Sequence, residues 1–432
     1  MPPGSETAVD ESPAWLSNDF LAEVLRPEGG AGVGVGVGPH DVSVLSWHVQ
    51  PAVGKGDNFL STLYRVRVEY RQAADAPDSA PRAVQLIIKV LPQGDYLQEF
   101  IHEARFFARE INAYREALPQ MARFAAARLP GGGGPPFSPR CFPTARPDTL
   151  VLEDLSTHGF KMADRRNLLD LPHCSLVLRR LARLHATSFA YSAHDRAFLA
   201  RFEDDIYNDG NREIMRRFLE PQMECLVEVA NTWPNFERIA KKIRKTIPRA
   251  VDKLISVCRK QDSDWKVLNH GDCWINNIMF KYSEKTGEVA DLRFIDFQIT
   301  RFASPALDIT YFMYTSPQSD VRARHMDRLL MEYCDEFRKT VRSLGYAGRV
   351  FSLKELRDEM RRVLFFGFTT SVGTLATVLA EPDQVMDLSE MTAEGLSSNV
   401  GVNPFTKLQS TAKFRDVFQQ LLPYFDQMEI FD

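Results

Sequence analysis

The sequence lacks the marks of several large classes of protein. Its 432 residues carry a formal net charge of only −4, so the charge gives no indication of nucleic acid or an anionic membrane as a partner. The six cysteines are scattered and contain no C-x-x-C pair, and the acidic N-terminus has no apolar core of the kind found in signal peptides. We therefore expect a cytoplasmic protein with reduced thiols. Nothing in the sequence indicates a protein partner.

Long apolar runs are also scarce. Residues 363–380 carry no charge, but their serine, four threonines and two glycines are typical of a poor lipid-facing helix. We expect a buried helix there and no membrane segment. The basic run at residues 238–245 is more typical of the solvated face of a helix than of a binding patch.

The chain is long for a single domain, and its composition, 44% hydrophobic and 25% charged, is that of a globular protein with a large core. We predict an α+β protein with a β-rich N-lobe and a mainly helical C-lobe. The predicted parts are an extension at 1–41, an N-lobe at 42–152 and a C-lobe at 153–432. The extension contains a short helix at 13–25 and a glycine- and valine-rich linker at 29–38. A dinucleotide-binding loop would have a strand before it and a helix after it, and this linker has neither.

Residues 62–70 alternate between apolar and polar side chains as a half-buried strand does, and we predict further strands at 42–49, which is strand-like, and at 83–90. Residues 100–118 have helical spacing, and we expect this helix to end near Pro119. Residues 150–155 are typical of a strand that leads from one lobe to the other.

The most informative segment is residues 267–280, followed by residues 294–298. It places Asp272 five residues before Asn277 and adds Asp296 after a predicted hairpin of residues 278–281 and 289–295. Phosphoryl transfer from a nucleotide needs a carboxylate that orients the attacking hydroxyl, together with an asparagine and an aspartate that hold magnesium. We therefore predict Asp272 as the catalytic carboxylate and Asn277 and Asp296 as the metal ligands.

Three neighbours of Asp272 receive other interpretations. We expect His270 to support the loop by hydrogen bonding. Cys273 is not expected to be a nucleophile, because nothing near it in the sequence would lower its pKa. Trp274 would line the substrate cleft or anchor the loop in the core, and the sequence does not decide between these roles.

A set of residues in the first half of the chain is predicted to bind the nucleotide. Gly54 and Gly56 lie between two strands, where glycine lets the backbone approach phosphate oxygens, and the side chains of Asn58 and Ser61 would add donors. Lys89 is a single charge in an apolar strand, which is costly to bury without a partner. We expect it to contact the nucleotide phosphates.

The remaining nucleotide contacts come from a helix and from the segment between the lobes. Glu110 is the predicted partner of Lys89, with Tyr114 one helical turn further on. The segment from Glu153 to Leu155 is predicted to offer the adenine ring backbone hydrogen bonds in an apolar slot.

Asp308 follows Asp296 by only twelve positions, which leaves no room for the long activation segment on which protein kinases dock peptides. A small-molecule alcohol is therefore favoured as the acceptor. We expect a structural role for Asp308, either capping the helix that it begins or bracing the catalytic loop, and we expect His185 to be a satisfied core histidine.

These motifs together resemble the ecdysteroid kinase-like family, also called CHK kinase-like, within the aminoglycoside phosphotransferase and choline kinase superfamily. The resemblance spans nearly the whole chain and is carried by PAWL at 13–16, GDNFLS at 56–61, ExxxY at 110–114, LEDL at 152–155, LHA at 184–186, HGDCWxNN at 270–277, IDFQ at 295–298 and SPxxD at 304–308.

The resemblance implies a protein-kinase-like bilobal fold, ATP and magnesium as cofactors, and transfer of phosphate to an alcohol. In the best-understood members of the family that alcohol is an ecdysteroid hydroxyl. By the matching motifs, Lys89 and Glu110 correspond to the phosphate-binding pair, Asp272 to the base, and Asn277 and Asp296 to the metal site. The acceptor does not transfer with the motifs, because it binds in the variable helical lobe.

Two alternatives remain open. A choline- or ethanolamine-type kinase would need an aromatic and acidic cage, for which the aromatic residues at 311–314 and 365–368 would serve as well as they would serve a steroid. A non-catalytic, pseudokinase-like binding protein is expected to have lost at least one of the key side chains. Lys89, Asp272, Asn277 and Asp296 are all present.

Overall fold

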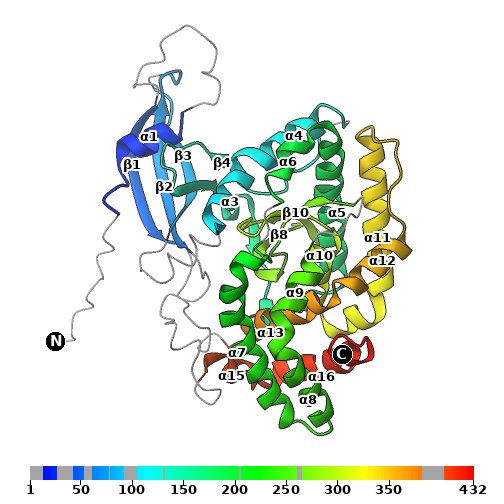
Figure 1. Cartoon of the computed structure of the whole chain (residues 1–432). Coiled ribbons are helices and arrows are strands. Elements are labelled where there is room, and N and C mark those ends of the chain that lie inside the picture. Colours follow the sequence, from blue (N-terminus) through cyan, green and yellow to red (C-terminus); the bar gives the residue numbers. More distant parts are fainter. Residues whose placement is uncertain are drawn as a thin grey trace, which may run out of the picture. The chain divides into compact units, whose positions relative to one another are not determined.

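The chain forms two compact units, residues 1–93 with 139–158 and residues 94–138 with 159–432. The computed structural model describes residues 13–26, 42–52, 61–76, 78–91, 105–129, 132–203, 206–259, 265–381 and 403–432. The predicted α+β class is confirmed, because an antiparallel sheet is the main element of the described first unit and helices dominate the second (Figure 1). The division into a nucleotide-binding part at 42–152 and an acceptor-binding part from residue 153 stays a prediction.

The first unit is built on a five-stranded antiparallel sheet in the order β1-β2-β3-β5-β4. Its elements are α1 (Asn18–Val24), β1 (Val42–Pro51), β2 (Thr62–Gln72), β3 (Arg82–Val90), β4 (Cys141–Phe142), β5 (Thr149–Glu153) and the 3-10 turn η2 (Leu155–His158). The strands predicted at 42–49, 62–70 and 83–90 are thereby confirmed. In the middle of β2 the buried Val66 and Val68 flank the exposed Arg67, as expected from the alternation by which the strand was predicted.

The first helix is shorter than the predicted range of 13–25. It begins at Asn18 because the Ser17 side chain accepts a hydrogen bond from the Phe20 N–H and so caps the helix. Phe20, Leu21 and Val24 are buried in the same core as the inner face of the sheet. The predicted packing role of this segment is correct, and only its starting residue is wrong.

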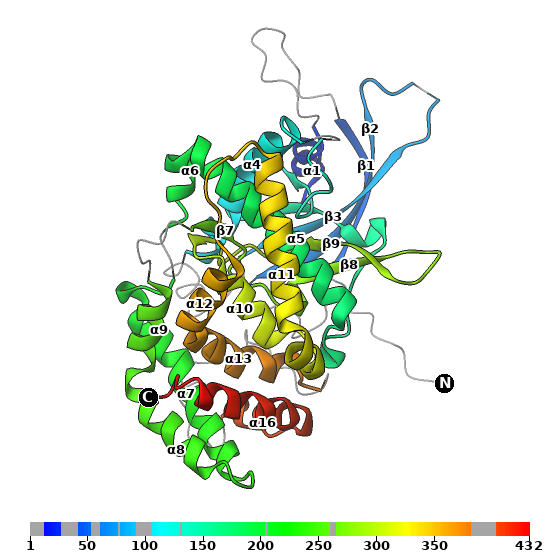
Figure 2. The ribbon, with the colours of Figure 1, turned by 90° about the vertical axis from the view of Figure 1, so that its right-hand side faces the viewer.

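The second unit is mainly helical, and its long helices α5 and α11 run side by side (Figures 1 and 2). Its helices are α3 (Phe106–Asn112), α4 (Leu118–Ala126), α5 (Leu171–His194), α6 (Arg196–Ala200), α7 (Arg212–Asn231), α8 (Glu237–Thr246), α9 (Ala250–Cys258), α10 (Ala306–Thr315), α11 (Ser319–Ser343), α12 (Leu353–Arg362), α13 (Leu364–Val378), α15 (Pro404–Gln409) and α16 (Ala412–Gln427). Its strands are β6 (Phe160–Met162), β7 (Val267–Asn269), β8 (Ile278–Tyr282), β9 (Val289–Phe294) and β10 (Arg301–Ala303).

The helix predicted at 100–118 does not end at Pro119, and this expectation is wrong. A π-helical turn, η1 (Ala113–Ala117), follows α3, and α4 then continues to Ala126. Pro119 lies in the first turn of α4, where a helix makes no use of the backbone N–H that proline lacks. Because of the π-helical turn before it, Pro119 lies at the start of a helical segment and does not end the helix.

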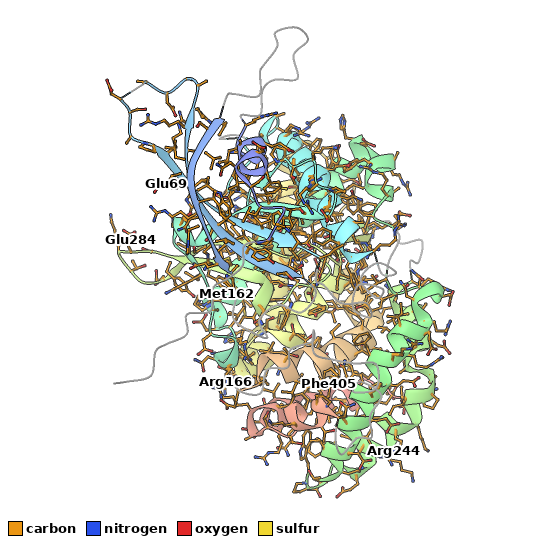
Figure 3. All side chains as sticks on the ribbon, turned by 90° about the vertical axis from the view of Figure 1, so that its left-hand side faces the viewer. Glu69, Met162, Arg166, Arg244, Glu284 and Phe405 are labelled. Carbon is orange, nitrogen blue, oxygen red and sulfur yellow. The ribbon has the colours of Figure 1, made fainter. Side chains whose placement is uncertain are left out.

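The charge-free segment at 363–380 forms α13, and most of its side chains are buried, as predicted. No helix in the described part of the chain is long and apolar enough to cross a membrane. The basic run at 238–245 lies in α8, where Arg244 forms an ion pair with Glu228 on the surface. Figure 3 shows Arg244 on this outer helix and Glu284 at the tip of the β8–β9 hairpin.

Candidate active site

The predicted hairpin is present and brings two of the candidate site residues together. β8 pairs with β9 so that Ile278 lies opposite Phe294, and the Ile295 N–H donates to the Asn277 carbonyl at 3.0 Å. Asn277 therefore precedes one strand at the same end of the hairpin at which Asp296 follows the other. Asn277 is 6% exposed, and its Nδ2 donates to the Asp272 Oδ2 at 2.8 Å and to the Asp272 carbonyl at 3.0 Å.

His270 joins the loop before Asp272 to the end of β9. Its Nδ1 accepts the Asp272 N–H at 3.2 Å, so the proton of the neutral ring is on Nε2, which donates to the Ile295 carbonyl at 2.9 Å. The ring also packs against Phe297, with centroids 4.4 Å apart. The supporting role predicted for His270 is confirmed.

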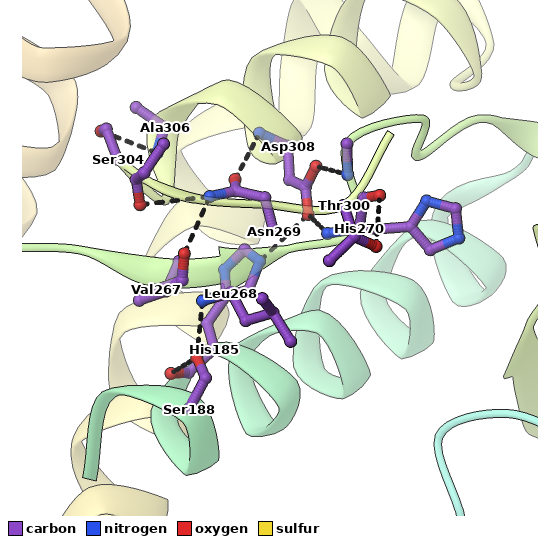
Figure 4. A network of polar contacts seen from close by, with 12 residues as sticks. His185, Ser188, Val267, Leu268, Asn269, His270, Thr300, Ser304, Ala306 and Asp308 are labelled. Atoms are coloured by element: carbon purple, nitrogen blue, oxygen red, sulfur yellow. Dashed lines mark hydrogen bonds and ion pairs between the residues drawn. The ribbon is translucent and has the colours of Figure 1, made fainter. Parts of the chain in front are cut away.

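Asp308, in the first turn of α10, braces the same loop (Figure 4). Its Oδ2 accepts the His270 N–H at 2.6 Å and its Oδ1 accepts the Gly271 N–H at 2.8 Å. His185 Nε2 lies 3.1 Å from Oδ2, and His185 Nδ1 lies 2.7 Å from the Tyr333 hydroxyl. Both predicted structural roles, for Asp308 and for His185, are thus confirmed.

The Asp308 carboxylate is buried, which by itself would raise its pKa. The hydrogen bond and the charge of His185, together with the Gly271 N–H, more than offset this effect, and the pKa of Asp308 is lowered. Asp308 is therefore held in its ionised form by groups of the fold itself.

Gly271 is the one residue of this loop for which only glycine fits. Its φ is +89°, and a Cβ built at this position would lie 1.9 Å from the Ile299 carbonyl oxygen. The close approach places the loop against the residues that follow Asp296, so the two carboxylate-bearing segments pack directly on each other.

Asp272 itself is only 8% exposed. Burial raises its pKa and the negative charge of Asp296 raises it further, whereas hydrogen bonds from Tyr311 and Asn277 lower it, and the net shift is upward. The Tyr311 hydroxyl also lies 3.1 Å from the Thr374 hydroxyl. Asp272 is thus positioned by two side-chain donors and lies in the field of a second carboxylate.

Asp296 has a backbone conformation that is rare for a residue with a side chain, with φ at +65°. Its N–H donates to the Tyr114 hydroxyl at 3.1 Å. Tyr114 is buried in η1 and packs edge-on against Phe297 at 5.4 Å. The helix that carries Glu110 is therefore connected through Tyr114 to the backbone of Asp296.

The residues present fit a magnesium site that binds nucleotide phosphates. The amide nitrogen of Asn277 is used by Asp272, which leaves Oδ1 as a hard oxygen ligand beside the Asp296 carboxylate. Within the described ranges no group of three or more His, Cys, Asp or Glu side chains could hold a metal ion alone.

The residues of the first unit that are predicted to contact the nucleotide lie on several separate elements. Lys89 is 5% exposed in β3 and Ser61 is half-buried just before β2. Glu153 is already engaged, because its Oε2 accepts the Arg140 N–H and its Oε1 lies 2.7 Å from His158 Nε2, and Leu155 is buried in η2. Gly54, Gly56 and Asn58 lie outside the described residues.

Glu110 is 1% exposed on α3, in the second unit, whereas Lys89 belongs to the first, so their pairing stays a prediction. Cys273 is fully buried, and burial raises the pKa of its thiol well above the usual value. Trp274 is 8% exposed, and its indole Nε1 has no hydrogen-bond partner. The burial of Cys273 agrees with the expectation that it is not a nucleophile, whereas the role of Trp274, in the substrate cleft or as an anchor of the loop, stays a prediction.

Tyr311 was missed as a site residue by the sequence analysis, which treated it only as one of several aromatic residues. A usable signal exists: Tyr311 follows Asp308 by three residues in one helix, so both lie on the same face. A helix face that braces the catalytic loop at Asp308 is expected to meet Asp272 about one turn further along.

The comparisons with known proteins agree with this set of motifs. The model of the ecdysteroid kinase-like family matches residues 55–346, which is more than half of the chain. No curated protein matches the sequence.

Several solved structures are similar. Choline kinase from Cryptosporidium parvum Iowa II is 12% identical with a TM-score of 0.47, covering 89% of this chain and 91% of that one. Ethanolamine kinase from Plasmodium vivax is 12% identical with a TM-score of 0.42, covering 89% and 83%. An aminoglycoside phosphotransferase from Streptomyces rimosus is 14% identical with a TM-score of 0.31, covering 71% and 89%. At these TM-scores the likenesses have no bearing on what this chain does.

Proposed function

This chain belongs to the ecdysteroid kinase-like family, and we propose that it is an ATP- and magnesium-dependent kinase that phosphorylates a hydroxyl group of a small molecule, a steroid alcohol of the ecdysteroid type. The observation that carries the proposal is the Asp272 carboxylate, which Asn277 and Tyr311 orient beside the charge of Asp296. A buried carboxylate beside a second, half-buried carboxylate and one amide oxygen is suited to a hydroxyl and a divalent cation.

In the proposed reaction, Asp272 accepts a hydrogen bond from the acceptor hydroxyl and holds its oxygen in line with the γ-phosphorus. The O–H bond breaks as the new O–P bond forms, and the proton passes to the Asp272 carboxylate while ADP leaves. Magnesium supplies positive charge that neutralises the phosphate oxygens, and Asn277 and Asp296 would hold it. Lys89, with Glu110 as its partner, would contact the phosphates.

The test is transfer of labelled γ-phosphate from ATP to a panel of ecdysteroids, choline, ethanolamine and sugars. We expect wild-type protein to label an ecdysteroid, Asp296→Ala to abolish turnover through loss of the metal, and Asp272→Ala to slow turnover about 10²–10⁴-fold with ATP binding largely intact. Unimpaired turnover of Asp272→Ala would refute the assignment of the base. Stabilisation by ATP and magnesium with no transfer to any alcohol would favour a non-catalytic binding protein.

A further inference from the structure

The peptide bond between Ile295 and Asp296 is held on both sides by buried side chains. Its carbonyl accepts a hydrogen bond from His270 Nε2 at 2.9 Å, and its N–H donates to the Tyr114 hydroxyl at 3.1 Å. Neither His270 nor Tyr114 is more than 1% exposed. Because a peptide unit is planar, hydrogen bonds on its two edges fix its orientation. His270 and Tyr114 are here called the peptide clamp.

One ring connects the two side chains of the peptide clamp. Phe297 is fully buried, and its ring centroid lies 4.4 Å from that of His270 and 5.4 Å from that of Tyr114. The contact with Tyr114 is edge-on, which is a favourable geometry for two aromatic rings. Since Phe297 follows Asp296 directly, the clamp holds both the peptide before Asp296 and the side chain after it.

The clamp holds Asp296 in a backbone conformation that is uncommon for a residue with a side chain. Its φ is +65°, in the left-handed region. With the peptide plane fixed and φ at this value, the direction of the Cα–Cβ bond is determined as well. The Tyr114 hydrogen bond therefore contributes to the direction in which the Asp296 carboxylate leaves the backbone.

The peptide clamp also reaches other parts of the candidate site. His270 Nδ1 accepts the Asp272 N–H at 3.2 Å, so the backbone of the proposed base is connected to that of Asp296 through one imidazole ring. Tyr114 belongs to the π-helical turn η1, and turns of this kind are frequent at functional sites. The orientation of Asp296 thus depends on hydrogen bonds from two separate segments of the chain.

We propose that Tyr114 is a positioning residue, whose hydroxyl keeps the Asp296 carboxylate oriented for magnesium. The inference rests on the proposed function, in which Asp296 is a metal ligand. Without the hydroxyl, the Asp296 N–H loses its acceptor, and conformations in which the carboxylate points elsewhere become populated. The affinity for the metal then falls by the fraction of molecules that leave the binding conformation.

The experiment measures binding of AMP-PNP, an ATP analogue that resists hydrolysis, by calorimetry in magnesium and in EDTA. The ratio of the two dissociation constants is the magnesium factor, and it requires no turnover. We expect Tyr114→Phe to reduce this factor about fivefold, which is the effect of losing one ordinary hydrogen bond on a conformational equilibrium. The affinity in EDTA should stay that of the wild type, because the Asp296 carboxylate acts on the nucleotide through the metal.

Tyr191→Phe is the matched control. Tyr191 is also buried, at 7% exposed, and its hydroxyl donates to Gln120 Oε1 at 2.7 Å, in the helix α4 that continues η1. The variant loses a buried tyrosine hydroxyl bonded to the same helical segment without affecting the Asp296 N–H, so its magnesium factor should stay that of the wild type. An equal decrease in both variants would show that packing of the segment, and not the bond to Asp296, matters.

Asp296→Gly tests whether Tyr114 acts through Asp296. Glycine adopts a positive φ readily and has no carboxylate, so this variant should lose most of the magnesium factor. Adding Tyr114→Phe should then reduce the factor no further, since the two changes remove one interaction. A further reduction as large as that in the wild-type background would overturn the proposal.

Two other outcomes separate this inference from the proposed function. Tyr114→Phe with an unchanged magnesium factor, including equal weakening of binding in magnesium and in EDTA, would overturn the role of Tyr114 and leave the kinase assignment in place. If magnesium did not tighten AMP-PNP binding to the wild-type protein, the proposed function itself would be contradicted, and the inference with it.

Discussion

Asp308 and Asp272 are two buried carboxylates of one site, and their surroundings differ in a way that separates structure from chemistry. Asp308 accepts two backbone N–H groups and faces His185, and its pKa is lowered. Asp272 receives hydrogen bonds from Asn277 and Tyr311, but it also lies near Asp296, and its pKa is raised. The fold itself stabilises the ionised form of Asp308, whereas the surroundings of Asp272 disfavour its ionised form.

The difference shows where the fold carries unfavourable free energy. The charge of the half-buried Asp296 raises the pKa of the buried Asp272, and a bound cation would relieve this opposition. The Asp308 region, by contrast, holds the loop that carries Asp272 through hydrogen bonds of the fold itself. Substitutions at the two carboxylates are therefore expected to have opposite consequences.

The largest expected effect on stability is that of Asp308→Asn. Asparagine has a single side-chain oxygen, so one of the N–H groups of His270 and Gly271 would face an NH₂ group, and His185 Nε2 would lose its carboxylate partner. Leaving a buried hydrogen-bonding group without its partner costs about 1–3 kcal/mol of unfolding free energy. Denaturant unfolding of the metal-free protein at neutral pH measures it.

Asp272→Asn is the matched comparison, because it makes the same isosteric change 36 residues earlier in the chain. Since ionised Asp272 is disfavoured in the folded state, this variant should be as stable as the wild type or more stable. For Asp308, whose folded pKa is lowered, the stabilisation is present above its unfolded pKa and is lost as pH falls through the folded value. The deficit of Asp308→Asn should therefore shrink in acid. Equal losses in both variants at neutral pH would contradict the comparison.

A smaller effect is expected for Tyr311→Phe, which removes one of the two donors to Asp272. The Tyr311 hydrogen bond lowers the pKa of Asp272, so its loss raises that pKa further, and the acidic limb of the kcat/KM profile moves to higher pH. Well above that limb the rate should be less affected. Thr374→Val provides the control, because Thr374 contacts the Tyr311 hydroxyl and not Asp272. An unchanged acidic limb in Tyr311→Phe would show that the tyrosine does not act on the base.

The contrast between Asp272 and Tyr311 also shows which site residues can be predicted from the sequence alone. Asp272, Asn277 and Asp296 lie within 25 residues and are joined by a loop and a hairpin, so local spacing and strand alternation were enough to predict their convergence. Tyr311 lies 39 residues from Asp272 and occupies an apolar helix in which most side chains are buried. Only the packing of that helix against the loop distinguishes it from its aromatic neighbours.

Arg301 and Pro119 illustrate the same limit in other elements. Arg301 contacts rings from residues 207 and 366, which no local pattern brings together. Pro119 follows a general rule for helix ends, but the π-helical turn before it decides that the helix starts again there. Interactions that depend on distant segments or on a change of helical register are therefore learned from the structure.

The smallest effect is expected at Cys273, which lies in the fields of both carboxylates. Burial raises the pKa of its thiol, and the charges of Asp308 and Asp272 raise it further. Since the thiolate is the reactive species, iodoacetamide should leave Cys273 unmodified in the native protein at neutral pH, whereas the half-buried Cys141 should react first. Mass spectrometry of the digested protein measures both. Cys273→Ala should keep near wild-type turnover. If Cys273 were labelled rapidly and turnover were lost, the loop would open far more often than its hydrogen bonds to Asp308 allow.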